Sequence, residues 1–501
     1  MDEASIGETI TIDAQIAALK KGMERLKRLN RLQRSLTAPV TKLPVELLGY
    51  IFDFYVEMQE TPWLLVLVSP LWRRIALSMS RLWRYIWVTN GTRIGNQREW
   101  DVGGDIGRVT SVGLYTKCVT EAELVQVLAL SGAVSLHVYL TLRKHRDRRE
   151  QSIDNDLLSQ LLGSPTSNRI EEIHLLIGGS DDFLPAPLSF YIETSYPRLK
   201  SLTIGNEGSP WDTNFIRKIL SSSELSSVKF NSAIPWEIAL PLRWTSVRHL
   251  ILPPYGLTMH TFNALCIKIQ NIQTLKAIPS GWPNESTPQM TFKLLEELDI
   301  RCETNHIHHL NLPSLTKLNL TALKGLIPNV YPSWALPVLS EFRASLTSEE
   351  IAKFLPSITM PKLHTLTLDI LGSLLEPFPA VTYPTVRSID LTCLASANYV
   401  TDALNAVPNS RKVVLSLYDS SDEIVWEILT RLTDTTHMVS PMAIEVHFVT
   451  QEKCLSIPNA SILSLFRSCV AGRKAISHRP FKIVFTTSSP DTGRISTEIF
   501  S

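Results

Sequence analysis

A short apolar motif recurs through most of this 501-residue sequence and constrains its fold more than any other feature. In each copy, an apolar residue is followed by a second one three positions later and by a third two positions after that. Successive copies begin 20 to 26 residues apart, at Leu199, Leu225, Val247, Ile272, Leu295, Leu315, Leu339, Leu363 and Val386. Alternating apolar residues are typical of a half-buried strand, so a repeat of this length predicts one strand and one connection per copy.

Proline recurs at a fixed position within this repeat. It stands two residues before the first motif position at Pro197, Pro313, Pro337, Pro361, Pro384 and Pro408. Proline ends a preceding helix and favours an extended start, so these positions indicate where each strand begins. Between the strands lie helix-like segments at 120–130, 347–355 and 422–432. The first two carry Thr-x-x-Glu capping boxes, which predict helix N-termini at Thr120 and Thr347.

Residues 106–490 therefore resemble a leucine-rich-repeat domain, with weaker copies at Val109, Ile170, Val413 and Ile444. The resemblance implies a solenoid in which strands form a parallel sheet on one side. The Asn or Cys of regular repeats is replaced here by residues such as Glu207, Tyr255, Glu303, Leu323, Leu371 and Leu394. We therefore expect an irregular solenoid. The alternative is an ordinary α/β domain in which strands and helices alternate.

A second constraint lies in residues 41–90. Pro44 suits the start of a helix, and Leu47, Leu48, Ile51, Phe52 and Tyr55 then recur at helical spacing. Further apolar segments follow at 63–68, 71–77 and 81–87, and a Ser-Pro breaker separates the first two. The stretch predicts short helices. About fifty residues bury little surface, yet this stretch holds four tryptophans, so part of its apolar surface must face something else.

The order of these motifs resembles an F-box, particularly the F-box-like domains of large fungal families. The similar residues are Leu43-Pro44-x-Glu46-Leu47-Leu48-x-x-Ile51-Phe52, then Leu67-Val68-Ser69-x-x-Trp72-Arg73-x-Ile75-Ala76 and Leu82-Trp83. An F-box is an all-α adaptor that docks on the Skp-type subunit of a cullin-based ubiquitin ligase. The resemblance implies an adaptor-binding face made by Leu43, Pro44, Leu47, Leu48, Ile51 and Phe52, with Trp63, Val68 and Trp72 completing or supporting it. The alternative is a helical cap on the next domain.

The rest of the N-terminal region is less informative. We expect residues 1–11 to be disordered and residues 12–37 to form a short amphipathic helix with a basic polar face. That helix could fold back on the F-box-like segment or pair with a second chain. Residues 91–105 are rich in glycine and indicate a linker. The fold class is thus α/β, with a short N-terminal helix and an all-α F-box-like domain before the irregular solenoid.

Composition and motifs exclude several functions. A net charge of +1 gives no overall field for nucleic acid or membrane, and six scattered cysteines suit reduced thiols in the cytoplasm or nucleus. We find no phosphate loop, zinc-protease motif or nucleophile elbow and expect no enzyme and no cofactor. Cys302, His306, His308 and His309 could hold zinc, but their spacing is typical of no structural site. The basic run at 143–149 is typical of an exposed loop.

These observations favour a substrate receptor of an SCF-type ubiquitin ligase. The F-box-like segment is expected to hold the Skp-type adaptor, and through it the cullin, while the repeats hold an unknown protein target. The rival hypothesis is a non-catalytic interaction scaffold whose F-box-like segment only caps the solenoid. Docking requires an exposed apolar surface and capping a buried one, so the accessibility of Leu47, Ile51 and Phe52 discriminates the two. An enzyme with an unfamiliar site is a third hypothesis.

Overall fold

The computed structural model divides the chain into two compact units, Met1–Tyr139 and Leu140–Ser501. Each unit is described by itself. The structure describes residues 19–27, 29–30, 43–57, 61–89, 116–118, 121–143, 155–178, 195–207, 213–222, 224–232, 244–253, 257–278, 290–302, 307, 309–322, 331–372, 376–394, 396–418, 427–428, 430–431, 445–451, 464, 466–471, 482–488 and 495–500. Residues 19–27 and 29–30 are helical, whereas the segments expected to be disordered or a linker lie outside these ranges.

Three α-helices and a 3-10 turn follow in the first unit: α2 (Val45–Glu57), α3 (Pro62–Val68), α4 (Pro70–Ser78) and η2 (Ser80–Trp83). Proline occupies the first position of both α3 and α4, where a missing N–H costs nothing. Ser69 separates them and caps α4, because its hydroxyl accepts a hydrogen bond from the Trp72 N–H at 3.1 Å.

The expected helices end earlier than the sequence indicated. Tyr85–Thr89 forms strand β1, which pairs in parallel with β2 (Thr116–Cys118) and also pairs with β3 (Leu136–Arg143). Helix α5 (Glu121–Ser131) lies between β2 and β3 in the sequence, near the predicted position. The prediction of an all-helical segment up to residue 90 was therefore wrong at its end. Ile86 and Val88 are buried in β1, and alternate burial of this kind is the pattern of a strand.

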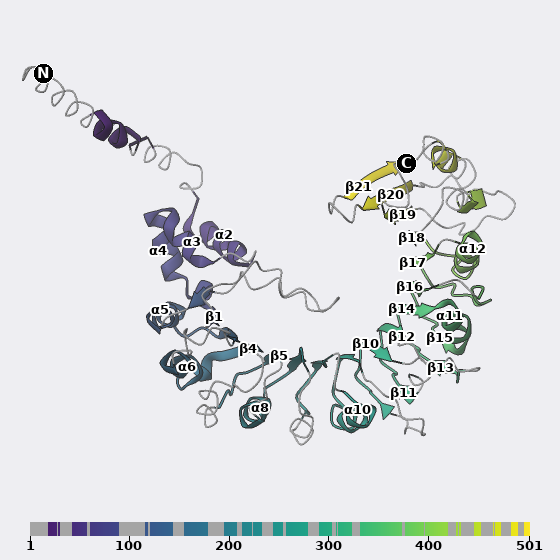
Figure 1. Ribbon diagram of the computed structural model, residues 1–501, viewed down its shortest axis with the longest axis horizontal. Helices are drawn as coiled ribbons and strands as arrows, with labels where there is room; N and C mark the ends of the chain where they lie inside the picture. The colour runs from purple at the N-terminus through teal and green to yellow at the C-terminus, as the bar shows by residue number, and fades with distance from the viewer. Residues whose placement is uncertain are drawn as a thin grey trace, which may run out of the picture. The chain divides into compact units, whose positions relative to one another are not determined.

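The second unit is built on a large parallel sheet (Figure 1). From β4 to β8 and on through β10, β12, β14 and β16 to β20, each of these strands pairs in parallel with the next. Strand β21 is antiparallel to its partner β20. The strands are β4 (Ile170–Gly178), β5 (Ser201–Glu207), β6 (Ser227–Phe230), β7 (His249–Ile251), β8 (Thr274–Ala277), β10 (Glu297–Cys302), β12 (Lys317–Ala322), β14 (Glu341–Thr347), β16 (Thr365–Leu371), β17 (Ser388–Leu394), β18 (Lys412–Tyr418), β19 (Glu445–Gln451), β20 (Lys482–Ser488) and β21 (Ile495–Phe500).

The apolar motif positions line up across this sheet and form its core. Leu298 on β10 is in register with Leu318, which is in register with Phe342 on β14. Two positions further, Ile300 is in register with Leu320 in the same way. All five side chains are at most 2% exposed. Because side chains alternate between the two faces of a strand, the second and third motif residues fall on one side and are buried together.

The phasing prolines lie in tight turns that start the strands. The N–H of the first motif residue donates to the carbonyl three residues earlier, as between Leu339 and Leu336 at 3.4 Å or Leu363 and Met360 at 3.3 Å. Pro337 and Pro361 each take the second position of such a turn, where a fixed φ is favourable. The next residue of each copy then donates to its equivalent in the previous copy, in an unbroken series from Glu171 to Arg411.

The connections lie on one side of the strands. In Figure 1, α8 (Thr213–Leu220), α10 (Met259–Cys266), α11 (Ser348–Phe354) and α12 (Ala397–Asn405) occupy the same side of the sheet. Other connections hold two-residue strands that pair in parallel, β9 (Met290–Thr291) with β11 (Leu310–Asn311) and β13 (Trp334–Ala335) with β15 (Ile358–Thr359). Helix α6 (Asn155–Leu162) and the 3-10 turns η5 (Thr166–Arg169) and η8 (Leu355–Ser357) complete the described elements.

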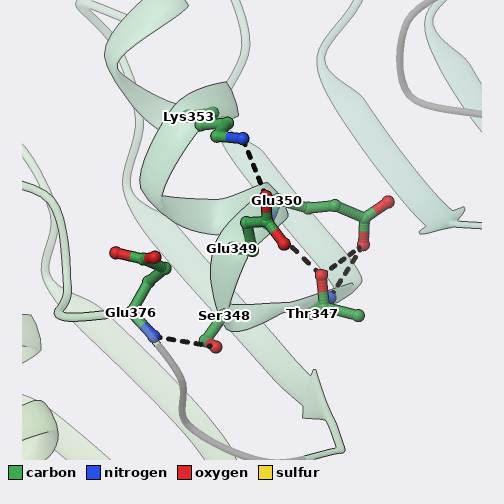
Figure 2. A network of polar contacts seen from close by, with 6 residues as sticks. All are labelled: Thr347, Ser348, Glu349, Glu350, Lys353 and Glu376. Carbon is green, nitrogen blue, oxygen red and sulfur yellow. Dashed lines mark hydrogen bonds and ion pairs between the residues drawn. The ribbon is translucent and has the colours of Figure 1, made fainter. Parts of the chain in front are cut away.

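The predicted capping box at Thr347 is confirmed (Figure 2). The Thr347 hydroxyl accepts from the Glu350 N–H at 3.3 Å, and the Glu350 carboxylate accepts from the Thr347 N–H at 2.8 Å. Two amide groups that α11 cannot satisfy internally are thus paired. A surface ion pair of Glu349 with Lys353 at 2.8 Å lies beside it.

The fold is mixed α/β, with helices and a large parallel sheet. In the part of the chain that the structure describes, no helix is both long and apolar enough to cross a bilayer.

Candidate functional site

Helix α2 begins one residue later than its sequence suggested. The Pro44 carbonyl accepts a hydrogen bond from the Leu48 N–H at 3.1 Å, so Pro44 is the residue that precedes the first helical position. Since the ring fixes φ and leaves no N–H to satisfy, proline still initiates the helix at this place.

The two sides of α2 differ in burial although both are apolar. Leu48 and Phe52 are each 0% exposed and point into the helical core. On the opposite side, Leu47 is 48%, Ile51 41% and Phe54 63% exposed. Successive residues of an α-helix are 100° apart around its axis, so Leu47 and Leu48 lie on different sides. Residues three or four positions apart share a side, which groups Leu48 with Phe52 and Leu47 with Ile51. A helix that is apolar almost all round is normally buried on every side, so one side of α2 is left uncovered by the residues that the structure describes.

Helix α3 repeats the pattern on a smaller scale. Leu65 and Val66 are buried, whereas Leu64, Leu67 and Val68 are 44%, 72% and 57% exposed. We call the set of exposed apolar residues on the two helices the α2–α3 apolar surface; it comprises Val45, Leu47, Tyr50, Ile51, Phe54, Leu64, Leu67 and Val68.

Two aromatic pairs that contain tryptophan join the helices of this segment. The ring centroids of Phe52 and Trp72 are 4.8 Å apart, and those of Trp63 and Trp83 are 4.6 Å apart. Trp83 is fully buried, and its indole N–H donates to the Ala76 carbonyl at 2.9 Å. Aromatic pairs of this kind stabilise packing beyond the area they bury. They hold α2 and α3 on α4 and η2.

A shallow hollow of about 380 Å³ opens beside α2. Arg81, which lines it, forms an ion pair with the Asp53 carboxylate at 2.5 Å. Its lining comes from α2, α4 and η2 and is mostly apolar in area: Val45, Glu46, Gly49, Ile75, Ser78, Met79, Ser80 and Arg81. Among its lining residues, Glu46 and Arg81 are the ionisable ones.

The nine residues predicted to bind an adaptor fall into three groups. Leu47, Ile51 and Val68 belong to the α2–α3 apolar surface, and Pro44 is exposed at the start of α2. Leu48 and Phe52 lie in the core of the unit. The other three, Leu43, Trp63 and Trp72, are partly buried. The structure thus separates residues that the motif placed on one face.

Tyr50, Phe54 and Leu67, which are 68%, 63% and 72% exposed, were not among the nine predicted residues, although Leu67 belongs to the F-box-like motif. A signal for the first two was present, because they lie three and four residues from Leu47 and Tyr50 on a helix with few polar positions. Such spacing marks a second apolar face, distinct from the one that contains Leu48 and Phe52.

Within the described residues, no group of three or more His, Cys, Asp or Glu side chains could hold a metal ion. His306 and His308 of the candidate zinc cluster lie outside these residues, as does the basic run from residue 144 onward.

The open face of the sheet in the second unit is polar and carries opposed charges. Lys276 on β8 forms an ion pair with Asp299 on β10 at 2.7 Å. Lys317 on β12 faces Glu341 on β14 at 3.5 Å. Residues that alternate with the buried rows line this face, so every strand contributes one side chain to each row. Such a face suits noncovalent contact with another protein.

Comparison with protein-family models and with curated proteins finds no match to this chain.

Proposed function

We propose that this protein is the substrate receptor of an SCF-type ubiquitin ligase in the cytoplasm or nucleus. The α2–α3 apolar surface docks on a Skp-type adaptor, which connects the chain to a cullin. The polar open face of the second unit holds a protein target. The receptor performs no bond chemistry; it raises the local concentration of the target near a ubiquitin-charged enzyme.

The observation that carries the proposal is the exposure of Leu47 and Ile51 on a helix that is apolar on both sides. A surface of this kind on a soluble protein indicates an interaction site. The residues coincide with the F-box-like motif, which is the sequence reason to choose an adaptor as the partner. Docking requires Leu47 and Ile51 to be exposed, and within the first unit they are.

The proposal includes the finer architecture. We take residues 41–84 as an F-box-like helical segment and the second unit as an irregular leucine-rich-repeat solenoid. Support comes from the motif registers, the proline turns and the series of hydrogen bonds from Glu171 to Arg411. The turn ladder of regular repeats is lacking at Leu371, which is 40% exposed. Connections with two-residue strands, such as β13, in place of helices account for the irregularity.

The test is capture of the full chain by a purified Skp-type adaptor. We expect the double variant Leu47→Ala with Ile51→Ala to lose adaptor binding while the second unit stays folded, because the two side chains supply the centre of the surface. Ile267→Ala is the matched control. Ile267 is 70% exposed in the second unit, so its truncation should leave adaptor binding unchanged.

Circular dichroism and thermal unfolding are measured for both variants to establish that each is folded. Undiminished capture of the double variant would refute docking through α2. If the folded wild-type chain itself fails to bind any Skp-type adaptor, the scaffold hypothesis replaces the receptor.

A further inference from the structure

One lysine on the open face of the sheet differs from the other charged residues there. Lys229 on β6 is half-buried, yet it forms no ion pair with an acidic side chain among the residues that the structure describes. By contrast, Lys276 has Asp299 at 2.7 Å and Lys317 has Glu341 at 3.5 Å.

The sheet register places Lys229 beside a second cation. Lys229 is in register with Ile251 on β7, and Ile251 is in register with Lys276 on β8. With neighbouring strands about 4.8 Å apart, the two lysine Cα atoms are about 10 Å apart, within reach of one small anion between their side chains. The row below consists of Ser227, His249 and Thr274, in which His249 Nδ1 and the Thr274 hydroxyl form a hydrogen bond with each other at 3.1 Å.

This arrangement is unfavourable for the chain on its own. Burial lowers the pKa of Lys229, and the nearby charge of Lys276 lowers it further. Burying a cation without a counter-charge costs free energy, and proteins keep such groups mainly at functional sites. Asn231 follows the end of β6 in the chain, and its side-chain oxygen is buried with no hydrogen-bond partner among the residues that the structure describes. A ligand with both an anionic group and an N–H would satisfy both residues.

The charges on the neighbouring strands β10 and β5 restrict which ligand the site can bind. Asp299 and Glu297 on β10 make the far side negative, whereas β5 presents the neutral Ser201 and Thr203. Since Asp299 pairs with Lys276, Lys229 is the one charged residue of β6, β7 and β8 left without a counter-charge among the described residues, and it carries one positive unit. One positive unit matches a carboxylate, whereas a phosphate dianion is better served by arginine and several donors.

We propose that the β6–β8 patch, made of Ser227, Lys229, Ile251, His249 and Lys276, binds a carboxylate side chain of an acidic segment of the target protein. Lys229 supplies the ion pair, Ile251 contacts the aliphatic part of the acidic side chain, and Ser227 and His249 offer hydrogen bonds. This inference rests on the proposed function only in naming the target as the bound protein.

The test uses the full chain and a fluorescein-labelled peptide of alternating glutamate and serine. Binding is followed by fluorescence anisotropy at low ionic strength, where surface charge is least screened. A matched peptide has glutamine at every glutamate position, and a third has phosphoserine there. We expect the glutamate peptide to bind at least about fivefold more tightly than the glutamine peptide, as a charge-assisted hydrogen bond predicts.

Two variants locate the site. Lys229→Met should weaken glutamate-peptide binding about fivefold or more without lowering the thermal midpoint, because an unpaired half-buried charge is removed. Lys317→Met is the control: this lysine lies on the same face but is half-exposed and paired with Glu341, so binding should change less than about twofold. If the methionine variant does not fold, Lys229→Gln removes the charge and keeps a polar side chain.

Equal binding of the glutamate and glutamine peptides would overturn the proposal, as would equal loss in the Lys229 and Lys317 variants. Tighter binding of the phosphoserine peptide, lost in Lys229→Met, would replace the carboxylate by a phosphate. Adaptor capture is measured separately, so failure of the receptor function leaves the peptide result unaffected.

Discussion

Adjacent leucines on α2 allow a direct test of how this helix divides its two faces. Leu48 is 0% exposed and Leu47 is 48% exposed, although both occur in the same turn. Leu48→Ala removes a fully buried side chain and leaves a cavity, which costs about 2–5 kcal/mol of stability. Leu47→Ala removes a side chain of which about half is already in water. Since a fully buried leucine contributes roughly 1.5–3 kcal/mol, the expected loss is about 1 kcal/mol.

The same numbers predict the opposite order for adaptor binding. About half of the Leu47 side chain is still available for burial by a partner, which corresponds to about 0.7–1.5 kcal/mol. Its truncation should therefore weaken adaptor affinity by roughly three- to tenfold. Leu48 contributes no exposed surface, so any effect of Leu48→Ala on binding arises through loss of the folded segment.

The assay is hydrogen exchange of the α2 amides by mass spectrometry, together with calorimetric titration of the adaptor. Local exchange reports the opening free energy of this segment, whereas a single transition is not expected for a chain with two units. Leu48→Ala should lose protection in α2 and α4, and Leu47→Ala should keep most of it. Equal loss of protection in both variants would refute the division of faces derived from the structure.

Three further outcomes test the second unit. Thr347→Ala should destabilise the α11 region by about 1 kcal/mol because it breaks the capping box, whereas Glu349→Gln, which breaks only a surface ion pair, should cost about 0.5 kcal/mol or less; hydrogen exchange of the α11 amides compares them. Tyr383→Phe should cost about 1 kcal/mol or more, since its hydroxyl donates to the buried Leu355 carbonyl at 3.0 Å, and denaturant titration measures the loss. Burial raises the pKa of the Cys393 thiol to about 12, so a disulfide reagent near neutral pH should modify Cys393 only after denaturation, and peptide mapping of the modified chain detects it.

Much of the sheet followed from local sequence. The motif at Leu363 predicted a strand, and β16 begins two residues later with Leu366 and Leu368 buried. The capping box at Thr347 was equally readable, because it involves residues three apart. Both predictions depend on short-range geometry alone.

Other features could not be read in this way. The run from Tyr85 to Thr89 is short and apolar, and such a run is compatible with a helix or a strand until its neighbours are known. Its pairing with β2 and β3, which follow after about thirty and fifty residues, makes it a strand. The sequence also did not reveal that Leu47 is exposed and Leu48 is buried, because α2 is apolar on nearly every side.

The sequence by itself determined the period of the repeat, the turns at its prolines and the apolar positions of the repeat strands and of residues 41–90. Each of these depends on backbone sterics and side-chain spacing within a few residues. Only the tertiary structure decided which side of α2 is covered and which charges on the sheet face meet a partner. Lys276 finds Asp299 and Lys229 finds no acid among the described residues, although nothing near either lysine in the sequence distinguishes them. Parallel register brings residues twenty or more positions apart side by side, and the free energy of a charge depends on those neighbours.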